Sequence, residues 1–202
     1  MEKQQVLLVN GGTAFSSDFD YNVSLTEGEI SLERMRPHES WKHSLQKKLG
    51  DNYDVLFAPM PNTSSAKYKE WEIVFDKVVK LLYNDIILIG HSLGGIFLAK
   101  YLSEHKLPIN IKALILIAAP YNDETQESLG DFKITDGAKL VKMGRTIDEV
   151  YLLYSEDDPI VNIVECGEYL DLWIHAQPIY FEDKGHFNLE EFPELIELIE
   201  KI

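Results

Sequence analysis

Residues 86–99 of the chain read IILIGHSLGGIFLA. The apolar run at 86–89 has the composition of a buried strand, and the residues that follow Ser92 have the apolar spacing of a helix. The pattern Gly-x-Ser-x-Gly lies between them, at residues 90–94. A serine on a tight turn from strand to helix has a strained backbone that projects its hydroxyl away from the sheet, and the flanking glycines let neighbouring backbone pass closely. The stretch therefore predicts a strand, a sharp turn and a helix, with Ser92 as a candidate nucleophile.

Further apolar runs alternate with helical patterns on both sides of this stretch. Runs that are nearly unbroken in apolar character are typical of strands buried on both faces of a sheet. The connections between them are too long for hairpins, so right-handed crossovers and parallel strands are expected. The sequence thus predicts an α/β fold in which a mostly parallel, twisted sheet of about six strands has helices on both faces. The expected strands are residues 5–9, 53–57, 85–89, 113–118, 149–154 and 178–181.

The length and composition are those of one globular domain covering residues 1–202. An excess of acidic over basic residues, 34 against 19, gives a net charge of −15 and disfavours nucleic acid or an anionic membrane surface as a partner. The single cysteine, Cys166, cannot form an intrachain disulfide, and the apolar run at 6–9 is too short for a signal peptide or a membrane span. We therefore expect a cytoplasmic protein, and the sequence does not indicate its oligomeric state.

Two connections are long for a compact domain, namely residues 13–39 and residues 121–147. Long loops in such domains usually carry function. Both segments are candidate lids, and the alternative for each is a surface excursion that contains a short helix.

A serine hydroxyl needs a base and an orienting acid to act as a nucleophile at neutral pH. Residues 155–159 read SEDDP after the fifth expected strand, and residues 185–187 read GHF after the sixth. Parallel strands end at the same edge of a sheet, so Asp158 and His186 are expected beside Ser92. The sequence therefore predicts a Ser-His-Asp triad.

Each of these partners also has a simpler interpretation. Asp157 and Asp158 are typical turn formers before a proline, and a single loop histidine such as His186 is often partly exposed. The joint placement of serine, aspartate and histidine favours catalysis. His91, next to the nucleophile, is expected to pack or to form hydrogen bonds behind it.

The oxyanion that forms during acyl transfer needs two backbone donors. The Leu93 N–H, at the start of the expected helix, is one candidate. The second is expected from the loop after the first strand, where residues 9–13 read VNGGT and either Gly12 or Thr13 could donate; the alternative is a simple tight turn.

No motif for a cofactor or metal is present in the sequence. The fingerprint G-x-G-x-x-G, the P-loop ending G-K-[ST] and the zinc motif H-E-x-x-H are absent, and cysteines are not paired. We therefore expect neither cofactor nor metal.

The chain resembles the small serine hydrolases that include retinoblastoma-binding protein nine and the bacterial YdeN-like proteins. The resemblance spans nearly the whole chain and rests on GHSLG at 90–94, DDP at 157–159, GHF at 185–187 and MP at 60–61. It implies a compact α/β-hydrolase fold with no large cap domain and no metal. It also implies Ser92 as nucleophile, Asp158 as acid and His186 as base. The segment between residues 12 and 41 is longer than in the shortest members of that group.

These observations predict a serine hydrolase that cleaves small acyl esters, like a carboxylesterase, through an acyl-enzyme intermediate. Its partner would be a small-molecule acyl substrate. The connection after the fourth strand is too short for a cap of several helices, which favours a shallow site for short acyl chains. The alternatives are a serine peptidase or amidase, and a non-catalytic protein-binding module on a hydrolase scaffold.

Overall fold

The computed structural model describes residues 3–122 and 128–202 of the chain. Its centre is a six-stranded sheet in the order β2-β1-β3-β4-β5-β6, and every neighbouring pair of strands is parallel. The strands are β1 (Gln4–Val9), β2 (Tyr53–Phe57), β3 (Ile86–His91), β4 (Ile111–Ile117), β5 (Glu149–Ser155) and β6 (Gln177–Phe181). The predicted α/β architecture with one parallel sheet is confirmed.

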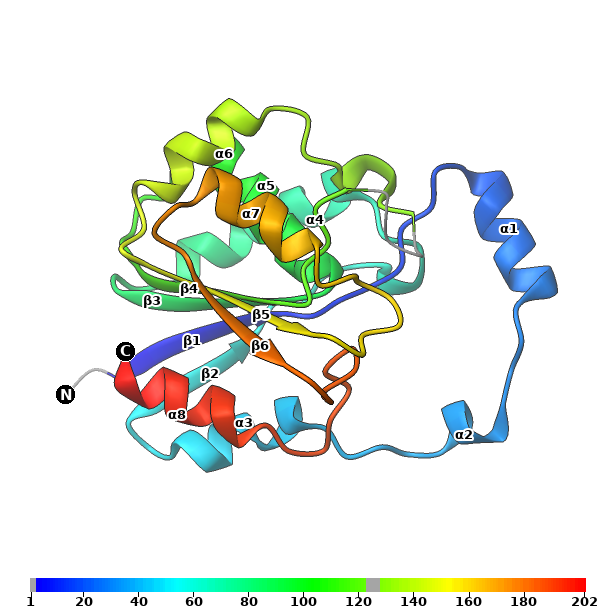
Figure 1. Cartoon of the computed structure of the whole chain (residues 1–202), viewed down its shortest axis with the longest axis horizontal. Coiled ribbons are helices and arrows are strands. Elements are labelled where there is room, and N and C mark those ends of the chain that lie inside the picture. The colour runs from blue at the N-terminus through cyan, green and yellow to red at the C-terminus, as the bar shows by residue number, and fades with distance from the viewer. Residues whose placement is uncertain (1–2, 123–127) are drawn as a thin grey trace.

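Helices cover both faces of this sheet (Figure 1). The α-helices are α1 (Asp18–Glu27), α2 (Leu32–Met35), α3 (Trp41–Leu49), α4 (Tyr68–Val78), α5 (Leu93–Glu104), α6 (Gly137–Gly144), α7 (Glu165–Leu172) and α8 (Pro193–Lys201). Short 3-10 turns are η1 (Thr63–Ser65), η2 (Val79–Leu81) and η3 (Gly130–Phe132). α3 and α8 lie together on one face, and α4, α5, α6 and α7 cover the other. Within the described residues, no helix combines the length and the apolar character needed to cross a membrane.

The central strands are buried on both faces, which explains their nearly unbroken apolar sequences. All six residues of β3 are buried, as are the last five of β1 and of β4. The third strand differs slightly from the expected range 85–89. Asp85 has a φ of 62° and precedes the strand, which continues to His91. The strand therefore runs directly up to the candidate nucleophile.

The long connection at residues 13–39 contains α1 and α2, which stand apart from the body of the fold (Figure 1). α1 follows the N-cap Ser17, whose hydroxyl accepts the Asp20 N–H, and none of its residues is buried. The side chains of Phe19, Leu25 and Ile30 are at least 62% exposed. This arm makes no hydrophobic core with the sheet, and its role as a lid stays a prediction.

The second lid candidate, residues 121–147, includes positions 123–127, which lie outside the described residues. The part that follows them packs onto the body of the fold. Phe132 in η3 and Leu140 in α6 are fully buried, and α6 contacts α5 and α7. From η3 onward the segment thus forms part of the helical layer over the sheet.

Candidate active site

Ser92 lies at the turn from β3 into α5, at the edge where the parallel strands end. Its φ of 54° and ψ of −126° are rare for a residue with a side chain, and such strain costs of order 1–3 kcal/mol unless the surroundings fix it. Two backbone hydrogen bonds do so: the Ser92 N–H donates to the Ile117 carbonyl and the Ser92 carbonyl accepts the Gly95 N–H, both at 2.8 Å. The strained turn expected from the sequence is present.

Gly90 and Gly94 are required by close backbone contacts behind the serine. A Cβ on Gly94 would overlap the carbonyl oxygen of Val9, and a Cβ on Gly90 would lie 2.6 Å from the Cα of Gly95. Neither contact can be relieved by a side-chain rotation, because both neighbours are backbone atoms. The two glycines thus let β1, β3 and α5 meet behind Ser92.

Asp158 and His186 form a hydrogen-bonded pair at the same edge of the sheet. Nδ1 of His186 lies 2.9 Å from Oδ2 and 3.2 Å from Oδ1 of Asp158, and the Asp158 side chain is almost completely buried. The Asp158 carboxylate also accepts the N–H groups of Ile160 and Val161 at 2.8 and 3.0 Å, which fixes its orientation. A carboxylate that faces Nδ1 favours a proton on that nitrogen and leaves Nε2 free to accept one.

The neighbouring Asp157 has a different position. Its carboxylate is exposed and accepts the Ser155 hydroxyl at 2.6 Å and the Gly185 N–H at 2.8 Å. The Ser155 hydrogen bond, with help from the Gly185 N–H, lowers the pKa of Asp157. Asp157 therefore ties the turn after β5 to the loop that carries His186, and it does not contact the imidazole.

The His186 imidazole lies beside the ring of the residue that precedes Ser92, and it is not hydrogen-bonded to the Ser92 hydroxyl. The His186 ring centroid lies 5.1 Å from that of His91, the residue directly before Ser92. Within residues 3–122 and 128–202, Ser92 Oγ makes no hydrogen bond to His186. Catalytic hydrogen bonds are often long without substrate and tighten in the Michaelis complex, so this geometry is compatible with proton transfer.

A small pocket with a cavity volume of about 10 Å³ opens at Ser92. Gly12 and Leu93 line it together with the serine, and Leu129, Ile160 and Val161 give it an apolar wall. Of the two residues expected to supply the second oxyanion donor, Thr13 has its N–H already donated to the Thr63 carbonyl at 2.8 Å. Gly12 is the one of the two that lines the pocket.

Behind the serine, His91 is buried and lies between two hydrogen-bond partners. Its Nδ1 is 3.0 Å from Nζ of Lys42, and its Nε2 is 2.9 Å from the backbone carbonyl oxygen of His186. Sequence reasoning placed His91 behind the nucleophile but missed Lys42. No local signal in the sequence indicates this contact, because the two residues are 49 positions apart.

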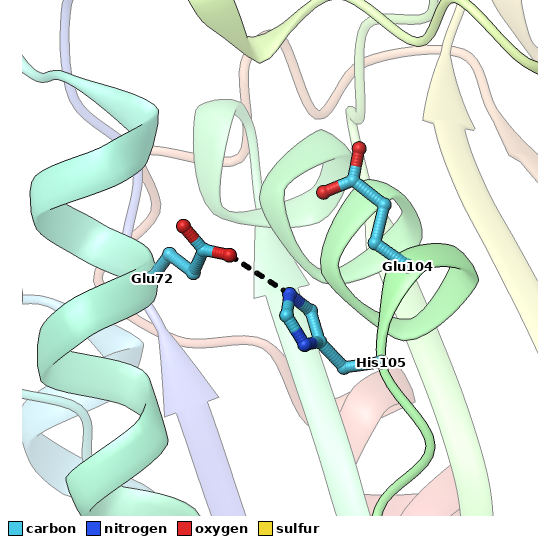
Figure 2. A group of neighbouring side chains, drawn as sticks. All are labelled: Glu72, Glu104 and His105. Carbon is cyan, nitrogen blue, oxygen red and sulfur yellow. Dashed lines mark hydrogen bonds and ion pairs between the residues drawn. The ribbon is translucent and has the colours of Figure 1, made fainter.

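Three side chains outside this site are close enough to hold a metal ion, although their sequence spacing gave no sign of it. Glu72 on α4 and Glu104 and His105 at the end of α5 offer ligand atoms within 4.8 Å of one another (Figure 2). Their charges and donors already have partners: His105 Nε2 lies 2.9 Å from Glu72, Tyr68 donates to Glu104, and Lys69 forms an ion pair with Glu72. The twelve residues of α5 separate Glu104 and His105 from the nucleophile by about 18 Å along the helix axis. We interpret the cluster of three side chains as a set of polar contacts that joins α4 to α5.

Known proteins are similar to this chain in sequence and in fold. The family described as serine hydrolase matches residues 34–199. Serine hydrolase RBBP9 of Rattus norvegicus is 28% identical over 153 residues, which cover 74% of this chain and 78% of that protein. The solved structure of the ydeN gene product from B. subtilis matches with a TM-score of 0.74 at 18% identity, over 98% of both chains. An esterase from Exiguobacterium antarcticum matches with a TM-score of 0.57 at 15% identity, over 98% of this chain and 91% of the esterase.

The family match covers most of the chain and includes the strained Ser92 turn, the Asp158–His186 pair and all of the sheet except β1. The likeness to the ydeN product extends over the whole fold, in agreement with the resemblance seen in the sequence. The chain therefore belongs to the serine hydrolase family and has the α/β-hydrolase fold of its RBBP9-like and YdeN-like relatives.

Proposed function

We propose that this hydrolase cleaves small acyl esters through a triad of Ser92, His186 and Asp158. The observation that carries the proposal is the buried Asp158–His186 hydrogen bond, which lies at the sheet edge where Ser92 occupies its strained turn. Likeness of fold to a solved esterase supports the choice of ester substrates.

In the first half of the reaction, Ser92 Oγ attacks the ester carbonyl carbon while His186 Nε2 takes the hydroxyl proton. The tetrahedral intermediate then breaks its bond to the leaving oxygen, which receives that proton from His186. The acyl group remains on Ser92. Asp158 keeps the imidazole in the tautomer that can accept a proton, and its negative charge stabilises the imidazolium.

In the second half, water attacks the acyl-enzyme by the same route. His186 takes a proton from the water, the carboxylic acid leaves, and Ser92 Oγ regains its proton. The oxyanion of both halves would receive hydrogen bonds from the N–H groups of Leu93 and Gly12, which line the pocket at Ser92. Each such donor is worth about 3 kcal/mol of transition-state stabilisation. The positive end of the α5 dipole adds to this effect.

A fluorophosphonate probe tests the proposal because it phosphonylates an activated serine. We expect one adduct per chain by intact mass, and peptide mapping should place it on Ser92. A heat-denatured sample, in which the site is lost, serves as the control and should remain unlabelled. A folded chain that takes up no probe would contradict the proposal and favour a non-catalytic binding module.

The size of the pocket predicts the preferred substrate length. Because the cavity at Ser92 has a volume of only about 10 Å³, p-nitrophenyl acetate to butyrate should be hydrolysed fastest, and kcat/KM should fall as the acyl chain lengthens to dodecanoate. Initial rates over this ester series measure the trend, and the matching p-nitroanilides should react more slowly. Highest activity on the longest chain would contradict the shallow site, and faster cleavage of the anilides would favour an amidase.

A further inference from the structure

Lys42 is a cation without an acidic partner in a protein that has many acids. Its side chain is partly buried at the start of α3, and within the described residues no carboxylate lies at ion-pair distance from its ammonium. Burial lowers the pKa of Lys42 to about 8. Its hydrogen-bond partner is instead the neutral ring of His91, at 3.0 Å. Burying a charge without a counter-ion is unfavourable, so we expect Lys42 to have a function that offsets this cost.

The Lys42 ammonium and the His186 carbonyl together fix which nitrogen of His91 carries the proton. A lysine ammonium has only donors, so Nδ1 of His91 must accept from it. The ring proton then lies on Nε2, which donates to the His186 carbonyl oxygen at 2.9 Å. Burial above all, and then the nearby Lys42 charge, keep the pKa of His91 well below its usual value, so the ring stays neutral.

The backbone that receives this hydrogen bond is strained. Phe187, directly after His186, is buried and has a φ of 54°, and such strain persists only where neighbours hold it. Trp41 supplies two of these supports: its Nε1–H donates to the Phe187 carbonyl at 2.9 Å and its backbone N–H donates to the Leu189 carbonyl at 3.0 Å. His91 supplies a third at the carbonyl of His186 itself.

We propose that Lys42 is a positioning residue that, through His91, fixes the loop carrying the catalytic base His186. The chain of contacts runs from the Lys42 ammonium to the His91 ring and on to the His186 carbonyl, while Asp158 holds the His186 ring from the other side. This inference rests on the proposed function, because it concerns the same base.

The proposal predicts a pH dependence. Above about pH 8 Lys42 loses its proton. The neutral amine can still donate an N–H to Nδ1 of His91, but the positive charge that strengthens this hydrogen bond is lost. The support of the His186 carbonyl through His91 then becomes weaker, and kcat should fall with a midpoint near that pH. The titratable group that acts on the pair from outside is His186, with Asp158 behind it, and the Trp41 ring flanks the ammonium at 5.6 Å.

Stability should change in the opposite direction. The folded-state pKa of Lys42 lies near 8, below the ordinary lysine value of 10.5, so between these values the unfolded chain binds a proton that the folded chain does not. The contribution of Lys42 to the free energy of unfolding therefore rises with pH over this window. A lysine with a merely structural role would not give lower activity together with higher stability as the pH rises.

The decisive variant is Lys42→Met, with Lys47→Met as the matched control because Lys47 is exposed on the same helix. At pH 7 we expect kcat for p-nitrophenyl acetate to fall about 10- to 100-fold in Lys42→Met with little change in KM, because a small displacement of the base is costly. The alkaline fall in kcat should vanish, and Tm should rise by about 2–4 °C as the buried charge is removed. Lys47→Met should match the unaltered chain in all three measurements.

Lys42→Met with an unchanged kcat and an unchanged alkaline limb would overturn the proposal. If that variant does not fold, the chain itself still provides the test through ¹⁵N-histidine NMR. We expect His91 in the Nε2–H tautomer at pH 7, and the Nδ1–H tautomer at that pH would overturn the proposal.

Failure of the proposed function gives a different result. In that case the folded, unaltered chain takes up no fluorophosphonate, whatever the tautomer of His91. If the unaltered chain is labelled and Lys42→Met is labelled at the same rate, only the positioning role fails.

Discussion

Replacing Ser92 by alanine is expected to lower kcat for p-nitrophenyl acetate by about 10⁶-fold and to abolish labelling by the fluorophosphonate, because removal of a serine nucleophile in a triad costs this much. The variant loses the atom that forms the acyl-enzyme, and the hydroxyl of Ser128, which also lines the pocket, already forms a hydrogen bond with the Ser16 hydroxyl at 2.8 Å. Stopped-assay hydrolysis and probe gels measure the two effects.

Ser103→Ala is the matched control for this variant. Ser103 lies on the same helix, α5, and its hydroxyl donates to the Lys100 carbonyl at 2.7 Å, at the end remote from the turn. We expect Ser103→Ala to keep its activity and its labelling. Both serine variants should keep the Tm of the unaltered chain within a few degrees, since alanine at position 92 has the same positive φ to adopt as serine. Hydrolysis at the original rate by a folded Ser92→Ala protein would rule out this nucleophile.

The fold was predictable because its signals are local. The central strands are buried on both faces, so their sequences are apolar without alternation, and this pattern is visible one strand at a time. The turn at Ser92 was predictable for a related reason. The two glycines that these close contacts require, Gly90 and Gly94, lie within five residues of sequence around Ser92, so they leave a recognisable pattern even though Gly94 packs against the distant Val9 carbonyl.

The finer features of the site depend on contacts between distant elements. That Lys42 reaches His91 depends on how α3 packs beside the end of β3, and no local pattern specifies that packing. The same holds for Glu72 and His105, which come together only because α4 lies against α5. Thr13 was a reasonable donor from its sequence, but a partner fifty positions away, Thr63, accepts its N–H.

The segment at residues 13–39 shows another limit of sequence reasoning. Its helix α1 has a normal N-cap at Ser17, so its formation follows a local rule. The position of α1 does not follow from a local rule, because none of its residues is buried against the sheet and no core contact fixes where it lies. A lid is defined by packing against the rest of the fold, which no local pattern in this segment specifies, so its assignment as a candidate lid stays a prediction.

Asp157 and Asp158 are adjacent in the sequence, yet the structure predicts opposite results for their replacement. Asp158→Asn should lower kcat by about 10⁴-fold with the fold intact. An amide keeps the shape of the carboxylate but favours the imidazole tautomer that cannot accept a proton from Ser92. The Asn side-chain oxygen can still accept the Ile160 and Val161 N–H groups, which leaves its N–H₂ facing His186 Nδ1. Nδ1 must then act as an acceptor, the ring proton moves to Nε2, and His186 can no longer take the proton from Ser92.

Asp157→Asn is the matched control, one residue away and of the same chemistry. Its carboxylate accepts the Ser155 hydroxyl and the Gly185 N–H, and an amide oxygen can accept both, so kcat should stay within a few-fold of the unaltered chain. Steady-state kinetics on one ester, with Tm recorded for both variants, compares them directly. An equal loss in both variants would mean that the turn as a whole, and not the Asp158 carboxylate, supports His186. A loss confined to Asp157→Asn would assign the acid of the triad to the exposed aspartate, which the buried Asp158–His186 hydrogen bond argues against.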